Sequence, residues 1–238
     1  MTKDDANSNA PLAGVGSMAT RLVLADLADL YERDSGCRVN VTSLGGVEAA
    51  RRVQGGEAFD FAVLASGAIA RLAAQGAVVG PRTDVVRSGM AVAVAAGAPC
   101  PDVGTEGALR ETILRAARVG YSTGPSGDHL MRLFERWGIA EALRPRLVKA
   151  QPGVPVASLI AQGEVEIGFQ QLSELKDVAG VDVLGPLPAG AQLVTVFSAA
   201  ICAVSRQPQA AADFLAFLAS ERAERAKRAY GMEPVGDA

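Results

Sequence analysis

The sequence predicts an α/β fold with two lobes, and three observations support this prediction. Apolar segments of strand length alternate with amphipathic segments of helix length from residue 20 onward. Glycine follows many of the helical segments, as expected where a left-handed residue ends a helix. Long apolar strands at 90–95 and 192–203 flank the middle of the chain, which indicates a chain that crosses to a second lobe and returns. We expect a largely parallel sheet.

The first part of the chain is expected to alternate helices and strands. At residues 20–31, leucines recur near the 3.6-residue period of a helix. Residues 37–44 are rich in β-branched side chains and alternate in polarity like a strand, until Gly45 and Gly46 interrupt the pattern. The expected elements are a helix at 20–31, a strand at 37–44, a helix at 47–54, a strand at 59–64, a helix at 69–74 and a strand at 90–95.

The second part follows a connection at 99–105 that is rich in proline and glycine, and it repeats the alternation. A turn-rich segment at 185–190 precedes the second long strand, and an alanine-rich helical region ends the chain. The expected elements are a helix at 108–118, a strand at 119–121, helices at 129–137 and 156–162, strands at 166–170 and 192–203, and a helical region at 209–230.

These elements predict how the chain divides. Lobe 1 is expected at 11–88 together with 196–238, and lobe 2 at 89–195. Residues 1–10 are polar and are expected to form a disordered tail.

The composition excludes several classes of protein. Of the 238 residues, 49% are hydrophobic and 21% are charged, so the chain can bury a large core. A net charge of −3 without a basic run argues against a nucleic-acid partner. Cys37, Cys100 and Cys202 lack the spacing of a zinc site or a disulfide framework, and there is one histidine, so we expect no metal.

The N-terminus and the apolar runs bear on the location of the protein. The first ten residues lack the apolar core of a secretory signal peptide, so we expect a cytoplasmic protein; a periplasmic protein whose leader was removed is the alternative. The longest apolar runs have the length of strands, so we expect no membrane insertion.

The segment from Tyr121 to Gly127 reads Y-S-T-G-P-S-G and leads into a helical pattern. The first amides of a helix lack acceptors within the helix, and the helix dipole attracts negative charge there. Gly124 and Gly127 would let the backbone approach a ligand closely. The segment lacks the G-K-[ST] ending of a phosphate-binding loop and is no nucleophile elbow. It therefore predicts a site for a small anion.

An ordered series of segments, from residue 14 to the C-terminus, resembles the molybdate-binding type of periplasmic solute-binding protein. The series is V-G-S-M-A-T, S-L-G-G-V, F-D-F-A-V-L-A-S, R-S-G-M-A-V-A-V, G-P-S-G, P-V-A-S-L-I-A-Q-G-E-V-E-I-G-F-Q-Q-L-S-E-L and F-L-A-F-L-A-S. The resemblance implies a two-lobed type II periplasmic-binding-protein fold, with two crossover strands as a hinge and an anion in the cleft between the lobes.

Several ligand positions depart from the pattern of that family. Ser17 matches a serine that binds the oxyanion in the first loop, whereas Gly45 and Gly46 stand where a serine-rich turn is typical. Gln171, in G-F-Q-Q-L-S-E-L, replaces a tyrosine that contacts the ligand. With these changes the chain resembles an offshoot of the family that includes aconitate isomerase, an enzyme without a cofactor that handles a tricarboxylate.

The resemblance leads to two hypotheses. In the first, the chain binds a di- or tricarboxylate and isomerises it by proton transfer without a cofactor. In the second, the chain is the solute-binding protein of a molybdate- or oxyanion-type ABC transporter. An ABC permease is then its partner, but only if the chain is exported.

The isomerase hypothesis needs an acid or base, and three residues are candidates. His129 has the only side chain with an ordinary pKa near neutrality, and Tyr121 and Glu174 are the others. Each has a simpler interpretation: a histidine that faces solvent, a tyrosine that packs at a strand end, and a charge at a helix start.

Binding of the anion needs hydrogen-bond donors at the strand ends and an arginine for a carboxylate. Arg87 is the first choice for that arginine, and Arg21 or Arg51 the second. The expected contacts are Ser17, Met18, Ser43, Gly45, Gly46, Ser66, Arg87, Ser122, Thr123, Ser126, Gly127, Pro155, Val156, Gln170 and Gln171.

Overall fold

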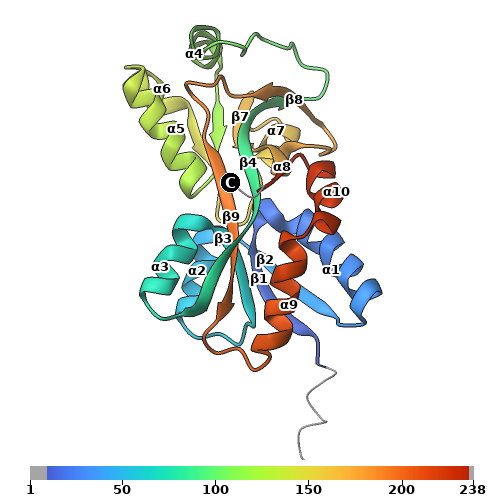
Figure 1. Cartoon of the computed structure of the whole chain (residues 1–238). Coiled ribbons are helices and arrows are strands. Elements are labelled where there is room, and N and C mark those ends of the chain that lie inside the picture. The colour runs from blue at the N-terminus through green and yellow to red at the C-terminus, as the bar shows by residue number, and fades with distance from the viewer. Residues whose placement is uncertain (1–9, 236–238) are drawn as a thin grey trace, which may run out of the picture. The chain divides into compact units, whose positions relative to one another are not determined.

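A computed structural model of the protein describes residues 10–235 (Figure 1). The disordered tail expected at 1–10 lies outside the described residues, except for Ala10. Among the helices described, none is both long and apolar enough to cross a membrane.

The chain divides into two compact units. Unit 1 comprises Met1–Arg87 and Val196–Ala238, and unit 2 comprises Ser88–Thr195. The strands β4 (Val78–Ala95) and β9 (Val194–Cys202) each contain one of the two points where the chain passes from one unit to the other.

The strand order β2-β1-β3-β9 lies in unit 1, and the next strand beyond β9 is β4, whose residues up to Arg87 also belong to unit 1. β1 (Leu12–Ser17) pairs in parallel with β2 (Val39–Leu44) and with β3 (Phe61–Ala65), and β9 pairs antiparallel to β3. Gly16 lies opposite Ser43 in this register. The carboxyl ends of β1, β2 and β3 therefore lie at one edge of the sheet.

Helices cover both faces of the unit 1 sheet. Apolar side chains of α1 and α9 pack with Phe61 on one face, and those of α2 and α3 pack with Leu64 on the other. A short strand, β10 (Glu233–Pro234), pairs antiparallel with β4. The helices of this unit are the 3-10 helix η1 (Met18–Thr20), α1 (Arg21–Ser35), α2 (Gly46–Gln54), α3 (Ser66–Ala74), α9 (Pro208–Ala219) and α10 (Glu221–Ala229).

The helical region expected at 209–230 consists of two helices, α9 and α10. Ser220 separates α9 from α10 with an extended backbone, at φ −78° and ψ 160°. Its hydroxyl donates to the carbonyl oxygen of Phe217 at 2.7 Å, and its own carbonyl accepts from the amide of Ala223 at 3.1 Å. A serine that bonds the adjacent backbone ends one helix and starts the next.

Unit 2 has a core sheet in the order β4-β7-β5-β6. β5 (Val119–Tyr121) pairs in parallel with β6 (Leu147–Lys149) and β7 (Ile167–Gln171), whereas β4 runs antiparallel to β7 and to β8 (Val181–Pro186). The expectation of a largely parallel sheet is thus only partly right, because β4, β8 and β9 all pair antiparallel.

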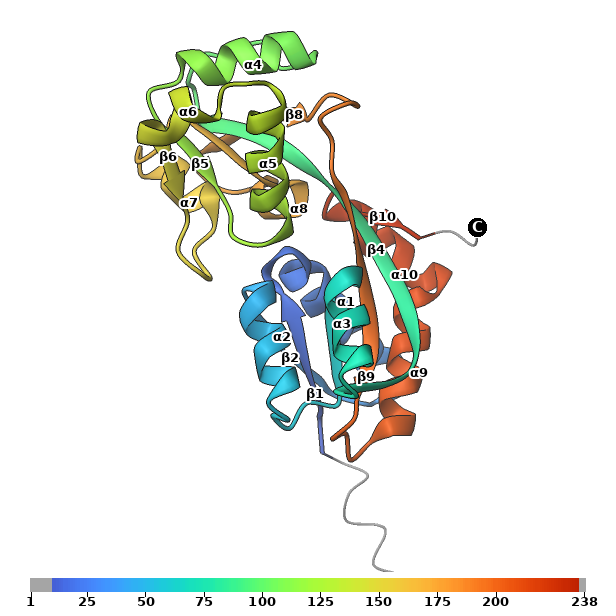
Figure 2. The ribbon, with the colours of Figure 1, turned by 90° about the vertical axis from the view of Figure 1, so that its left-hand side faces the viewer.

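Two groups of helices cover the unit 2 sheet, and Figure 2 shows α5 and α7 on either side of β5. Leu130 and Phe134 of α5 pack with Phe169 on one face, and Val156 and Ile160 of α7 pack on the other. The helices of this unit are α4 (Glu106–Arg115), α5 (Pro125–Arg136), α6 (Ala140–Leu143), the 3-10 helix η2 (Arg144–Arg146), α7 (Val156–Ala161) and α8 (Leu172–Leu175).

Candidate functional site

The strand-end edge of unit 1 brings together the residues expected there from the sequence. Ser17 ends β1 and is only 6% exposed, and its hydroxyl has no hydrogen-bond partner among the described residues. The hydroxyl of Thr20 donates to the carbonyl oxygen of Ser17 at 3.0 Å and fixes the turn. A side chain at Gly16 would reach within 2.8 Å of Leu24, so a glycine is needed for α1 to pack this closely.

Three helix starts follow the three parallel strands of unit 1. Met18 begins η1, Gly46 begins α2 after the N-cap Gly45, and Ser66 begins α3. None of these three helices has a side-chain hydrogen bond at its N-cap. The first backbone amides of these helices are therefore not bonded to a capping side chain. Such amides can donate to an acceptor such as a carboxylate.

Two of the three arginines chosen from the sequence, Arg87 and Arg51, have partners of their own in unit 1. Arg87 donates to the carbonyl oxygen of Pro234 at 3.5 Å and lies 3.6 Å from the carboxylate of Glu233. Arg51 forms two hydrogen bonds with Glu48, at 2.7 and 2.8 Å. Binding of a ligand carboxylate by Arg87 stays a prediction.

The Y-S-T-G-P-S-G segment of unit 2 connects β5 to α5. Gly124 is the N-cap at φ 80°, a conformation that favours glycine, and Pro125 takes the first helical position. A side chain at Gly127 would lie 2.0 Å from the carbonyl oxygen of Ser122. The close packing of the helix start against its own loop therefore explains why residue 127 is a glycine, in addition to any approach of a ligand. Thr123 lies in the same half-buried loop.

Two consecutive glutamines end β7, and their side chains point to opposite faces of the sheet, as the strand period requires. Gln170 lies on the α7 face, and its Oε1 accepts from the amide of Val156 at 2.7 Å. Gln171 lies on the α5 face, and its Nε2 donates to the hydroxyl of Ser126 at 2.8 Å. Together they connect the starts of two helices to one strand end.

Gln170 also holds a carboxylate. Its Nε2 donates to Oε1 of Glu174 at 2.7 Å, so both ends of the amide are used inside unit 2. The amide of Val156 is likewise taken by Gln170, and the preceding Pro155 has no amide hydrogen. Direct contact of Pro155, Val156 or Gln170 with an anion stays a prediction.

Gln171 has a second partner that the sequence analysis missed. Its Nε2 donates to the hydroxyl of Thr195 at 3.0 Å. The residue is 4% exposed, and its Oε1 is one of two buried side-chain atoms without a hydrogen-bond partner among the described residues; the other is the hydroxyl of Ser88. A threonine inside an apolar strand gives no sequence signal, because threonine is also an ordinary strand former.

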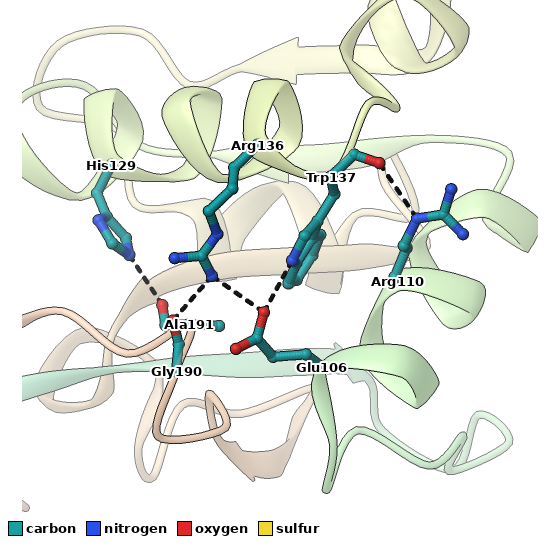
Figure 3. A network of polar contacts seen from close by, with 7 residues as sticks. All are labelled: Glu106, Arg110, His129, Arg136, Trp137, Gly190 and Ala191. Carbon is teal, nitrogen blue, oxygen red and sulfur yellow. Dashed lines mark hydrogen bonds and ion pairs between the residues drawn. The ribbon is translucent and has the colours of Figure 1, made fainter.

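His129 takes part in a network that fixes a turn, which Figure 3 shows. Its Nε2 lies 2.8 Å from the carbonyl oxygen of Ala191. Arg136, on the same helix, donates to the carbonyl oxygen of Gly190 at 2.8 Å and to Glu106 at 3.0 Å. Both side chains therefore attach α5 to the turn that precedes β9.

Tyr121 ends β5, and its ring lies against the start of α5, 3.2 Å from the position that a side chain at Gly127 would take. It also packs on the core that contains Phe134 and Phe169. Packing thus accounts for Tyr121 without a catalytic role, and such a role stays a prediction.

One ionisable group with a strongly shifted pKa lies in unit 1, at Cys202. Burial raises the pKa of the Cys202 thiol to about 12, with a smaller contribution from the charge of Asp60. These residues lie at the amino end of β3, opposite the strand-end edge. Cys37, Cys100 and Cys202 are all free. No group of three or more metal-ligating side chains occurs within residues 10–235.

Comparison with known proteins agrees with this architecture. Residues 12–233 match the family model described as bacterial extracellular solute-binding protein. The sequence is 35% identical over 231 residues to an aconitate isomerase of a Pseudomonas species, and the match covers 94% of this chain and 87% of that protein.

Two solved structures are similar along almost the whole chain. The periplasmic molybdate-binding protein of Azotobacter vinelandii has a TM-score of 0.79 at 19% identity, with 95% of this chain and 100% of that chain covered. The sulfate-binding protein of Mycobacterium tuberculosis H37Rv has a TM-score of 0.78 at 16% identity, with 95% and 88% covered. They confirm the expected type II periplasmic-binding-protein fold.

Proposed function

This chain belongs to the bacterial extracellular solute-binding protein family, and we propose that within the family it is an isomerase of a di- or tricarboxylate that needs no cofactor. The observation that carries the proposal is the similarity to aconitate isomerase over nearly the whole chain. The similarity covers 94% of the chain and therefore extends over both units.

The proposed reaction moves one proton along an allylic unit of the substrate. A base takes a proton from the methylene carbon next to the double bond, the double bond shifts, and the proton returns at the other end of the unit. One C–H bond breaks and one forms, so the reaction consumes neither water nor an oxidant. Hydrogen-bond donors near the carboxylates stabilise the delocalised anion formed in between.

Glu174 is our choice for the base. Its carboxylate is half-buried just after the carboxyl end of β7, and it accepts a hydrogen bond from Gln170 at 2.7 Å, which orients it. His129 and Tyr121 are the other candidates, but the ring of His129 is already bonded to Ala191. The start of α5, at Ser126 and Gly127, is proposed to hold a carboxylate by its amides and the helix dipole.

Other contacts with the substrate are proposed at the strand ends of unit 1. Ser17 has a hydroxyl without a partner among the described residues, and the helix starts after β2 and β3 offer amides without side-chain caps. These proposed contacts are Ser17, Met18, Ser43, Gly45, Gly46 and Ser66, with Arg87, Ser122 and Thr123 as further candidates.

The test is a thermal-shift screen with molybdate, sulfate, citrate, cis-aconitate and trans-aconitate, followed by an absorbance assay of aconitate isomerisation. We expect the aconitates to raise the Tm and to be interconverted. If only molybdate or sulfate raises the Tm and no aconitate is turned over, the proposal is wrong.

The variant Glu174→Gln tests the base. Its amide keeps an oxygen that can accept from Gln170 but cannot take a proton, so we expect turnover to fall by about 100- to 10,000-fold. The Tm shift with trans-aconitate should remain. Glu164→Gln, an exposed glutamate of the same unit, is the matched control and should leave turnover unchanged.

A second function is favoured by the family and by the similar solved structures, which are those of a molybdate-binding and a sulfate-binding protein. In this alternative the chain is the anion-binding component of an ABC transporter and acts with a permease. It requires export, whereas the isomerase is expected in the cytoplasm. Cell fractionation with the native N-terminus separates the two: accumulation in the periplasm would favour the carrier.

A further inference from the structure

The hydroxyls of Ser126 and Thr195 share one hydrogen-bond partner in unit 2. The side-chain Nε2 of Gln171 donates to both, at 2.8 and 3.0 Å, so both of its hydrogens are used. Each hydroxyl oxygen acts as an acceptor in this contact. The hydrogen of each hydroxyl must therefore point in another direction.

These two hydroxyl hydrogens have no acceptor within the described residues. The side chains of Ser126 and Thr195 make no further hydrogen bond there. Oε1 of Gln171 is also without a partner, although the residue is 4% exposed. If the amide were turned by 180°, Oε1 would accept from both hydroxyls, and the two hydrogens on Nε2 would be without an acceptor instead. The cluster therefore has two unused hydrogen-bond donors in either orientation.

Two spare donors at the start of α5 suit an anionic group with two oxygens. Ser126 is the second residue of this helix of 12 residues, where the dipole favours negative charge. A carboxylate accepts hydrogen bonds on two oxygens and donates none, so it can take both hydrogens without leaving a donor unpaired.

We propose that the hydroxyls of Ser126 and Thr195 both donate to one carboxylate of the ligand, and that Gln171 is the positioning residue that directs their hydrogens toward it. Thr195 becomes a binding residue, and Gln171 acts through its two neighbours rather than by direct contact. This inference rests on the proposed function, because the proposed substrate supplies the carboxylate.

Gln171→Glu is the sharpest variant, because it changes one amide nitrogen to oxygen. A carboxylate at this position accepts from both hydroxyls, turns their hydrogens inward and adds a negative charge. We expect the Kd for propane-1,2,3-tricarboxylate, measured by calorimetry, to rise by about 100-fold or more. Gln162→Glu makes the same change at an exposed position of unit 2 and should leave the Kd unchanged.

Thr195→Val and Ser126→Ala each remove one donor with little change of shape. Loss of a hydrogen bond to a charged group should weaken binding by about 10- to 100-fold in each variant. In the Gln171→Glu background, Thr195→Val should have little further effect, because the hydrogen has already been turned away from the ligand. The Tm without ligand shows that each variant is folded.

Two outcomes separate this inference from the proposed function. If the Kd of folded Thr195→Val and the KM for trans-aconitate equal those of the wild type, Thr195 is no donor and the inference is overturned, even if isomerisation is confirmed. If the variants lose tricarboxylate binding as expected but the wild type isomerises nothing, the inference stands and the isomerase proposal fails.

Discussion

Nε2 of His129 lies 2.8 Å from the carbonyl oxygen of Ala191, and because a carbonyl oxygen only accepts, that nitrogen carries a hydrogen. Two helical turns further along α5, Arg136 donates to the carbonyl oxygen of Gly190. The sole histidine of the chain thus anchors a helix to the turn before β9.

This anchoring predicts the effect of His129→Ala. We expect the free energy of unfolding to fall by about 1 kcal/mol, the usual net value of a hydrogen bond, with little change in the turnover of aconitate. Urea denaturation and the isomerisation assay measure the two effects. Arg132→Ala, at an exposed position of the same helix, should change neither. A large loss of turnover at unchanged stability would instead make His129 the base.

Gly127→Ala should destabilise unit 2, because the added methyl would lie 2.0 Å from the backbone oxygen of Ser122. The cost of such overpacking is about 1–3 kcal/mol, visible as a lower urea midpoint. Gly107→Ala is a matched control, since its methyl would lie 4.0 Å from the hydroxyl of Thr105 at the start of another helix. Alanine is the better helix former, so this control should be stabilised by about 0.5–1 kcal/mol. Equal stability of the two variants would contradict the close packing.

Lys227 predicts a dependence of stability on pH. The side chain is 2% exposed, and burial lowers its pKa from 10.5, while the charge of Glu224 opposes the shift. Below the lowered folded pKa both states hold the proton, so the folded protein carries the full cost of burying the charge. As pH rises from that pKa toward 10.5, the folded state releases its proton first and the lysine becomes less destabilising.

The variant Lys227→Met tests this effect. Methionine keeps the apolar contacts without the charge, so we expect it to be more stable than the wild type at neutral pH by about 1 kcal/mol. That difference should shrink as pH approaches 10.5, and comparing the two proteins at each pH cancels the titration of other groups. Lys149→Met, at an exposed lysine, is the control. If the difference in stability between the two proteins did not vary with pH, the titration of Lys227 would not contribute to the pH dependence of stability.

Periodic patterns predicted the longer elements of the fold. The leucine spacing of α1 and the alternation of β2 are local signals, and both elements formed within a few residues of the expected bounds. The strand β6, which is three residues long, was not predicted. The direction in which β4 and β9 pair depends on partners far away in the chain, so a local pattern cannot reveal it.

The candidate site could be predicted only residue by residue. Ser126 and Gln171 stood out individually, as a serine at a helix start and a polar residue at a strand end. Their hydrogen bond joins positions 45 residues apart, and the bond to Thr195 spans a further 24, so no spacing in the sequence indicates the cluster. The same holds for Arg87, whose partners are residues near the C-terminus, 147 positions away in the case of Pro234.

Gln170 and Gln171 are adjacent in the chain, yet each side chain is hydrogen-bonded to the first turn of a different helix. A single short piece of backbone therefore sets the reference position for α5 and α7 at once. If β7 were displaced along its axis, both helix starts would be displaced with it by the same amount. The two glutamines therefore attach both helix starts to the end of the same strand.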